Sequence, residues 1–263
     1  MNSNLPVKPQ DMVRKIYHKL SRSWGPQHWW PAETPFEVIA GAILTQNTSW
    51  TNVERALASL RQAGRLSVEG IRATPLLELE QLVRSSGYYR QKADRLKRFV
   101  SFLDERYSGS LEKMFASPTE TLRTELLSLK GVGHETADSI LLYAANHEIF
   151  VVDTYARRIL FRHGAISDNA KYDDVRVLVE DALRAARPAK LSLLKTSRPA
   201  KMVIHKPSFA SRAQRSPLGQ VYNEMHGLLV QVGKHYCLKA APNCLDCPLG
   251  ILLPQPGRLP SAT

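Results

Sequence analysis

The fold of this chain is decided by the stretch Leu129-Lys130-Gly131-Val132-Gly133-His134-Glu135-Thr136-Ala137. Gly131 and Gly133 permit a positive φ or a close backbone approach that a side chain would block. Residues 119–129, before the glycines, have a helical pattern. After the glycines, apolar residues recur at i, i+3, i+4 and i+7, namely at Ala137, Ile140, Leu141 and Ala144. The stretch therefore predicts a helix-hairpin-helix motif over about residues 119–146.

The turn of this motif is a candidate DNA contact. Exposed amide groups at the start of its second helix carry the positive end of the helix dipole, which favours an anion such as a DNA phosphate. The DNA-binding candidates are Gly131, Val132 and Gly133. Such contacts would position DNA without reading its sequence. A glycine that only separates two packed helices is the alternative explanation of the same pattern.

A carboxylate follows one helix later, in Val151-Val152-Asp153-Thr154-Tyr155-Ala156-Arg157-Arg158. An Asp directly before a helical segment is commonly its N-cap and needs no catalytic explanation. One helix after a candidate DNA-binding turn, however, a carboxylate is also a candidate functional group. Asp153 is therefore a candidate catalytic residue, with capping as the alternative role.

Nearly every other periodic segment is helical. Five further segments carry apolar residues at helical spacing, and only residues 149–152 resemble a strand, which is too short to found a sheet. The fold class is therefore predicted to be all-α. The five apolar sets are Phe36, Ile39, Ala40, Ile43 and Leu44; Trp50, Val53, Leu57 and Leu60; Leu96, Phe99, Val100 and Leu103; Val175, Leu178, Val179 and Leu183; and Val221, Met225, Leu228, Leu229 and Val232.

Length and composition indicate a globular protein. With 263 residues, 43% of them hydrophobic, the chain can bury a substantial core in one or two domains. No stretch approaches the length of a membrane span, and residues 1–10 lack the apolar region of a secretion signal. We expect an intracellular protein, cytoplasmic and associated with the nucleoid, without a membrane partner.

The charge of the chain points to an acidic partner. The net charge is +12 and the isoelectric point lies near 9.8, which suggests a polyanion. Residues 187–216 contain eight Lys or Arg and no Asp or Glu, together with prolines and serines and without sustained periodicity. We interpret this segment as a basic, disordered insertion. A solvated loop and a dedicated DNA contact are both compatible with it.

Four collinear blocks resemble the endonuclease III family of base-excision DNA glycosylases, over about residues 29–247. The resemblance implies two helical lobes with a DNA cleft between them. One lobe is a six-helix barrel over residues 34–147, and the other combines residues 1–33 with 148–263. The four blocks are the hairpin with its Asp153 segment; Gly41-Ala42-Ile43-Leu44-Thr45-Gln46-Asn47-Thr48; Gly87-Tyr88-Tyr89-Arg90-Gln91-Lys92-Ala93; and a cysteine run near the C-terminus.

The resemblance also implies roles for single residues. Asp153 matches the catalytic aspartate of the family, and Glu135 stands where bifunctional members carry a lysine that forms a Schiff base with the sugar. A carboxylate cannot form an imine, so we predict a monofunctional enzyme that leaves an abasic site. Gln46 would fill the space that a flipped base vacates, and Tyr88 would wedge the opposite strand. Polar capping for Gln46 and loop packing for Tyr88 are the alternatives.

The tryptophans of Trp29-Trp30-Pro31 bear on the substrate. Trp29 and Trp30 suit a stacking surface for a flipped, electron-poor base, and a cationic alkylpurine suits it because π faces attract cations. Packing inside the core or between domains is the alternative. With the hairpin that lacks the lysine, this element resembles the endonuclease III-type 3-methyladenine glycosylases.

All three cysteines lie in the loop 237–247, as Cys237, Cys244 and Cys247. Their spacing matches the first three ligands of the [4Fe–4S] loop of the family, but Leu253 stands at the position of the fourth. Three thiolates could hold a cluster with one exchangeable site, or zinc with help from His235, or nothing. We favour a structural cluster and expect no other cofactor.

The sequence thus predicts a monomeric base-excision repair glycosylase. Its partner would be double-stranded DNA with damaged bases, and its substrate a flipped alkylated purine. One alternative is a bifunctional glycosylase and abasic-site lyase for oxidised pyrimidines, and another is a non-catalytic DNA-binding protein. An adenine-mismatch glycosylase would need a further recognition domain, for which the chain has no room.

Overall fold

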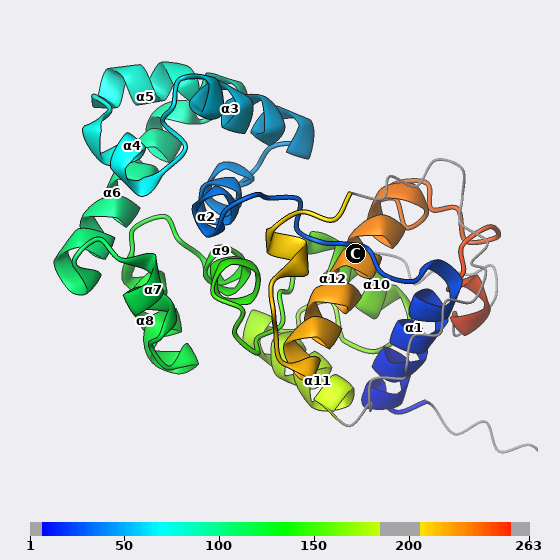
Figure 1. The fold of residues 1–263 in the computed structure, drawn as a ribbon. Coiled ribbons are helices and arrows are strands. Elements are labelled where there is room, and N and C mark those ends of the chain that lie inside the picture. Colours follow the sequence, from blue (N-terminus) through cyan, green and yellow to red (C-terminus); the bar gives the residue numbers. More distant parts are fainter. Residues whose placement is uncertain (1–6, 185–205, 254–263) are drawn as a thin grey trace, which may run out of the picture. The chain divides into compact units, whose positions relative to one another are not determined.

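The computed structural model describes residues 7–184 and 206–253. Within these ranges every regular element is a helix, so the predicted all-α fold is confirmed (Figure 1). None of the helices in the described part is long and apolar enough to cross a membrane. The chain divides into two compact units, one formed by residues 30–147 and 208–213, the other by residues 1–29, 148–207 and 214–263.

The first of these units, here the hairpin unit, contains most of the shorter helices. Its central helix is α2, Pro35–Leu44, in which every residue from Phe36 to Leu44 is buried. Thr34 caps α2 by accepting a hydrogen bond from the Glu37 amide at 3.1 Å, and Pro35 occupies the first turn, where no amide is needed. The other helices are α3, Trp50–Gln62; α4, Val68–Ala73; α5, Leu76–Leu82; α6, Tyr89–Tyr107; α7, Leu111–Phe115; α8, Thr119–Ser128; and α9, His134–Ser139.

Three short elements complete the hairpin unit: the 3₁₀ turns η1, Arg84–Ser86, and η3, Ala210–Arg212, and the π-helical turn η2, Ile140–Ala144. The helix predicted over residues 134–146 is therefore α9 continued by a π turn, in which the Ala145 amide donates to the Ile140 carbonyl. This bond skips one residue more than an α-helical bond does.

The second unit, here the aspartate unit, is built around α12, Pro217–His235, drawn in orange in Figure 1. All residues from Val221 to Gly233 are buried, as expected for a helix in the middle of a core. Against α12 pack α1, Pro9–Trp24; α10, Thr154–Arg162; and α11, Tyr172–Arg184. Ser216 caps α12 by accepting from the Gly219 amide at 3.0 Å. A 3₁₀ turn, η4, Gly250–Leu252, ends the described part.

The prediction of a disordered insertion over residues 187–216 is wrong at the C-terminal end of this segment. Residues 208–213 belong to the hairpin unit and contain η3. The buried Ser208 hydroxyl donates to the Trp30 carbonyl at 2.9 Å, and the Ala210 amide donates to the Ala32 carbonyl at 3.0 Å. These contacts fix a stretch whose composition alone indicated disorder. Residues 187–205 lie outside the described ranges.

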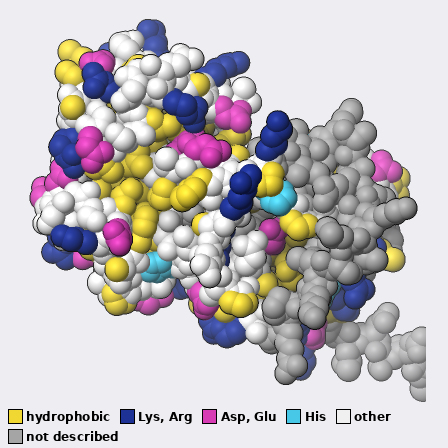
Figure 2. All heavy atoms as spheres, in the orientation of Figure 1, with side chains coloured by type: hydrophobic (Ala, Val, Ile, Leu, Met, Phe, Trp, Pro, Cys, Tyr) yellow, Lys and Arg dark blue, Asp and Glu magenta, His cyan; other side chains and the backbone are white. Residues whose placement is uncertain are grey.

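Lys and Arg side chains are interspersed with Asp and Glu on the molecular face shown in Figure 2. On this face, the described residues do not gather their positive charge into one patch.

Candidate functional site

The hairpin turn joins α8 to α9, and its two glycines have different conformations. Gly131 has a φ of +91°, which favours glycine, and a Cβ there would lie 2.3 Å from Arg95 Nε. Gly133 has a φ of −98° and a ψ of 178°, an extended conformation open to any residue, and a Cβ there would meet no atom within 4 Å. The fold therefore requires glycine at 131 but not at 133.

The amides of the turn are not all available to a ligand. The Val132 amide donates to the Leu129 carbonyl at 2.9 Å, and the Val132 side chain is buried. The Val132 amide is therefore used within the turn, whereas DNA binding by Gly131, Val132 and Gly133 remains a prediction. Within the described ranges, the exposed Gly133 has no hydrogen-bond acceptor for its amide.

Gln46 lies against this turn, just beyond the C-terminus of α2. Its Nε2 donates to the Gly131 carbonyl at 3.0 Å and to the Thr136 hydroxyl at 2.8 Å, and its Oε1 accepts from Arg95 on α6. The structure thus brings together two motifs that are 85 residues apart. In this conformation the Gln46 amide supports the hairpin.

The block of residues 87–93 contains an exposed aromatic side chain and a buried cation. Tyr88, directly before α6, is 65% exposed, and its backbone is in the left-handed helical conformation with a φ of 47°. The fully buried Lys92 donates to the Leu44 carbonyl at 2.9 Å and to the Ser86 carbonyl. Burial lowers the pKa of Lys92 to about 8. Lys92 therefore fixes the end of α2, from which Gln46 projects.

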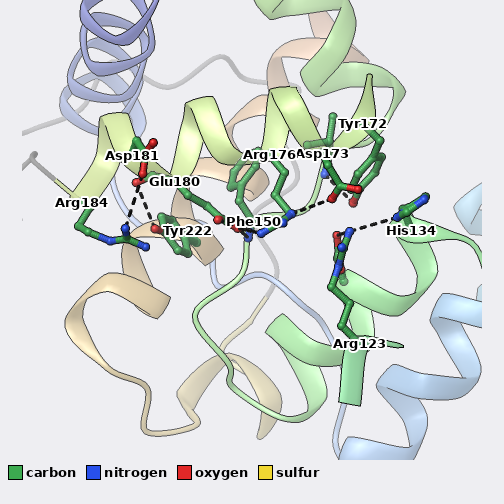
Figure 3. A network of polar contacts seen from close by, with 12 residues as sticks. Arg123, His134, Phe150, Tyr172, Asp173, Arg176, Glu180, Asp181, Arg184 and Tyr222 are labelled. Atoms are coloured by element: carbon green, nitrogen blue, oxygen red, sulfur yellow. Dashed lines mark hydrogen bonds and ion pairs between the residues drawn. The ribbon is translucent and has the colours of Figure 1, made fainter. Parts of the chain in front are cut away.

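Glu135, His134 and their neighbours occupy the first turn of α9. Glu135 and His134 are exposed, whereas Thr136 is buried. Arg123 on α8 forms a buried ion pair with Asp138 at 2.7 Å, and its guanidinium lies 3.1 Å from His134 Nδ1 (Figure 3). This ion pair joins the two helices of the motif, so the hairpin is held as one body.

Asp153 is the N-cap of α10 in the aspartate unit. Its Oδ1 accepts a hydrogen bond from the Ala156 amide at 2.7 Å, so the capping role considered from the sequence is real. Its Oδ2 lies 3.6 Å from Nε2 of His226 on α12. The residue is only 8% exposed. Asp153 and the hairpin belong to different units.

The segment before Asp153 is held by side chains of α11. Residues 149–152, which resembled a strand in the sequence, form neither a strand nor a helix. The Phe150 amide donates to Glu180 Oε1 at 2.9 Å, and the Val152 amide donates to the Tyr172 hydroxyl at 3.2 Å. Figure 3 shows Glu180 reaching Phe150. Glu180 also forms an ion pair with Arg176, in which Arg176 Nη1 lies 3.0 Å from Glu180 Oε2. These bonds satisfy buried backbone amides and set the direction in which α10 starts.

His226 is the buried neighbour of Asp153 that the sequence did not reveal. Burial lowers its pKa, whereas the Asp153 charge acts in the opposite direction. Its ring centroid lies 6.4 Å from that of Trp29 and 6.2 Å from that of Phe150. In the sequence, the only signal was a histidine on the apolar face of the helix over residues 217–235. A histidine buried in the core without a functional role would give the same pattern.

The two adjacent tryptophans pack into different units. Trp29 lies beside His226 and against the surface that Gly227 leaves open, and the ammonium of Lys234 lies 5.6 Å from its ring. Trp30 packs in the hairpin unit, with ring centroids 5.1 Å from Trp50 and from Tyr143. Each tryptophan is only 5% exposed. The packing role considered from the sequence is thus realised, and a base-stacking role remains a prediction.

The three cysteines line one small cavity in the aspartate unit. Cys237, Cys244 and Cys247 share it with Leu253 and His163, whereas His235 does not line it. Arg162 donates to Cys237 Sγ at 3.2 Å. No three His, Cys, Asp or Glu side chains in the described part gather closely enough for a metal ion. The described part of the chain therefore shows no formed metal site at these thiols, and an iron–sulfur cluster there remains a prediction.

Burial raises the pKa of Cys247 to about 11 and also raises that of Cys244. Uptake of iron by these thiols would therefore release protons, because only thiolates bind metal.

Comparison with known proteins gives consistent similarities. The family model described as HhH-GPD superfamily base excision DNA repair protein matches residues 40–185. A putative DNA repair glycosylase of Methanocaldococcus jannaschii is 41% identical, over 91% of this chain and 94% of that protein. Endonuclease III of Thermotoga maritima is 27% identical, over 81% of this chain and 79% of that protein.

A solved structure is also similar. The crystal structure of the H. pylori 3-methyladenine DNA glycosylase bound to 1,N6-ethenoadenine matches with a TM-score of 0.66 and 27% identity. The match covers 87% of this chain and 98% of that one.

Proposed function

Because the chain belongs to the HhH-GPD superfamily of base excision DNA repair proteins, we propose that it is a monofunctional glycosylase for alkylated purines in double-stranded DNA. The family membership makes it a DNA glycosylase, so the predicted enzyme class is confirmed. The proposal adds the monofunctional chemistry and the substrate. The observation that carries it is a carboxylate, Glu135, where a lysine nucleophile would stand, in a chain that also holds the buried carboxylate of Asp153 at the N-cap of α10.

The proposed reaction is hydrolysis of the N-glycosidic bond. The bond between C1′ and the base nitrogen breaks with its electron pair moving to the base, and positive charge develops on the sugar. The Asp153 carboxylate stabilises this charge and orients a water molecule, whose oxygen bonds to C1′. The water proton passes to the carboxylate or to solvent, and an abasic site remains. The bonds that hold residues 149–152 keep the carboxylate in place.

Glu135 is the second residue on which the proposal depends, because it excludes the alternative reaction. A lysine there would attack C1′ and lead through an imine to strand cleavage. A carboxylate has no amine to form that bond, and no step of the proposed reaction passes through Glu135. The bifunctional alternative therefore lacks its nucleophile at this position.

Alkylated purines are proposed because of the aromatic groups near Asp153. Trp29 lies beside His226, which neighbours Asp153, so its indole is one of the aromatic surfaces near the proposed reaction within its unit. A cationic base gains from stacking on such a ring. The similar H. pylori enzyme carries 3-methyladenine in its name, which supports the same class. Since both tryptophans are nearly buried, a flipped base would displace neighbouring side chains to reach them.

DNA is proposed to bind through the hairpin turn. Gly133 offers an exposed amide and open space above its Cα, which a phosphate oxygen can approach. Gln46 would leave its hydrogen bonds with the hairpin to fill the space of the flipped base, and the exposed Tyr88 would contact the opposite strand.

The cysteine loop is proposed to hold an iron–sulfur cluster through Cys237, Cys244 and Cys247. When bound, such a cluster would tie the loop to the end of α12 as a structural group. Leu253 at the fourth corner would leave one iron without a protein thiolate. We expect Leu253→Cys to retain more iron than wild type under a chelator, by elemental analysis and visible absorbance. Wild-type protein without iron and sulfide after anaerobic purification would refute the cluster.

Free bases released from methylated and from oxidised DNA, separated by chromatography, test the function. We expect methylated purines from the first DNA and no oxidised pyrimidines from the second. Borohydride should trap no covalent complex with wild type, while Glu135→Lys restores an amine and provides the positive control. Release of oxidised pyrimidines with strand cleavage would favour the bifunctional alternative. DNA binding without any base release would favour the non-catalytic one.

A further inference from the structure

The two oxygens of the Asp153 carboxylate are held differently. Oδ1 is fixed by the Ala156 amide at 2.7 Å. A single hydrogen bond leaves the carboxylate able to turn, because the torsion to a planar group is soft. Oδ2 lies 3.6 Å from His226 Nε2, slightly beyond hydrogen-bond length, and such contacts often tighten when substrate binds. His226 is thus placed to control the second oxygen.

His226 has little freedom to move. It is buried on α12, with Trp29 on one side and Phe150 on another, whose rings meet it at interplanar angles of 57° and 73°. The Phe150 backbone is itself fixed by the Glu180 carboxylate at 2.9 Å. The imidazole therefore points Nε2 toward Asp153 in one packed orientation.

The charge state of the ring follows from its surroundings. Burial disfavours the imidazolium, so the pKa of His226 is lowered despite the nearby carboxylate, and the ring is neutral at pH 7. A neutral imidazole carries one N–H, and a carboxylate can only accept. The tautomer with hydrogen on Nε2 is the one that suits Asp153. Other ionisable side chains around this part of α12 include Tyr155, Glu224 and Lys234.

We propose that His226 is a positioning residue for Asp153, whose Nε2–H group holds Oδ2 and so keeps the carboxylate facing the reacting sugar. The inference rests on the proposed function of Asp153 and adds a residue to it. A neutral donor orients the carboxylate without cancelling its negative charge, which the positive sugar requires. An imidazolium would cancel much of that charge.

The tautomer can be tested without any substrate. In full-length protein labelled with ¹⁵N-histidine, the signal that is lost in His226→Gln should be that of a neutral imidazole at pH 7 with hydrogen on Nε2. We expect Asp153→Asn, which keeps an N-cap, to shift this signal. Hydrogen on Nδ1 instead, or a charged ring at pH 7, would overturn the proposal even if the enzyme has another substrate.

Single-turnover base release from methylated DNA tests the positioning role. His226→Met introduces a side chain of similar size without a hydrogen-bond donor. Because misplacing a reacting group costs on the order of 10²-fold in rate, we expect base release to slow by about 10- to 100-fold. DNA affinity should stay unchanged. His226→Gln keeps an N–H near the Nε2 position and should recover most of the rate.

Leu228→Ala is the matched control, since it removes a buried side chain from the same helix without touching Asp153. It should lower the melting temperature and leave the rate of the folded enzyme unchanged. If His226→Met releases base at the wild-type rate, or if His226→Gln is as slow as His226→Met, the proposal fails. If wild type releases no methylated base, the proposed substrate fails, and the tautomer measurement still decides the role of His226.

Discussion

Gly133→Ala distinguishes a hairpin that binds DNA from one that only separates two helices. The backbone at Gly133 is extended and a Cβ would meet no atom within 4 Å, so the variant should fold normally. Alanine also restricts the unfolded chain, so the free energy of unfolding should be unchanged or higher by roughly 0.4–1 kcal/mol. If nothing approaches the turn from outside, DNA affinity should not change either.

We expect the DNA affinity to fall, because the added methyl group would stand where the phosphate approaches. The Gly133 amide would then lose a hydrogen bond to a charged group, which contributes about 1.5–3 kcal/mol. The Kd should therefore rise by about 10- to 150-fold. Fluorescence anisotropy with a duplex that carries an abasic-site analogue measures this change, and urea unfolding measures the stability.

Two other glycines provide controls. Gly131→Ala should destabilise the protein, because Gly131 has a φ of +91° and a Cβ would lie 2.3 Å from Arg95 Nε. A Cβ at Gly64 would meet no atom within 4 Å, but Gly64 has a φ of +66°. Gly64→Ala should therefore lower the free energy of unfolding only through backbone strain, by about 1–2 kcal/mol. Wild-type DNA affinity in Gly133→Ala, or a stability loss as large as that of Gly131→Ala, would refute the reasoning.

Three further predictions concern Asp153, Lys92 and Glu180. Asp153→Asn should keep the cap and the stability but slow single-turnover base release by about 10²–10⁴-fold; an unchanged rate would contradict its role. Buried Lys92 has a pKa of about 8 in the folded protein instead of 10.5, so between these values the folded state binds fewer protons than the unfolded chain. The free energy of unfolding should therefore rise by about 2 kcal/mol from pH 8 to 10 relative to Lys92→Met, measured by urea unfolding. Parallel pH profiles of the two proteins would contradict this. Glu180→Ala removes the acceptor of the Phe150 amide and the partner of Arg176, so it should lower the free energy of unfolding by about 3–5 kcal/mol and slow base release; a fully active, equally stable variant would argue against the support of residues 149–152.

The family and the fold class were predictable because they depend on local patterns. Glycines between two helical periodicities predicted the hairpin, and the matches to relatives confirm the predicted family. The capping role of Asp153 was also predictable, since an N-cap bond joins residues three apart. Composition misled at residues 208–213, because their order comes from bonds to residues about 180 positions away.

The partners of the site residues were not predictable from spacing. Gln46 bonds to the hairpin across 85 residues, and Lys92 reaches the end of α2 across 48. His226 looked like any polar residue on a helix, and only the packing of α12 against α10 places it beside Asp153. The tryptophans, adjacent in sequence, enter two different units.

The sequence by itself determined the hairpin, the candidate carboxylate and the absence of a lysine at position 135, because each depends on residue identity and short-range backbone geometry. The tertiary structure decided which hairpin amide remains available, what holds Gln46, and which buried side chain faces the second oxygen of Asp153. These depend on contacts between segments far apart in the chain, whose geometry is set by packing of the whole core rather than by any local pattern.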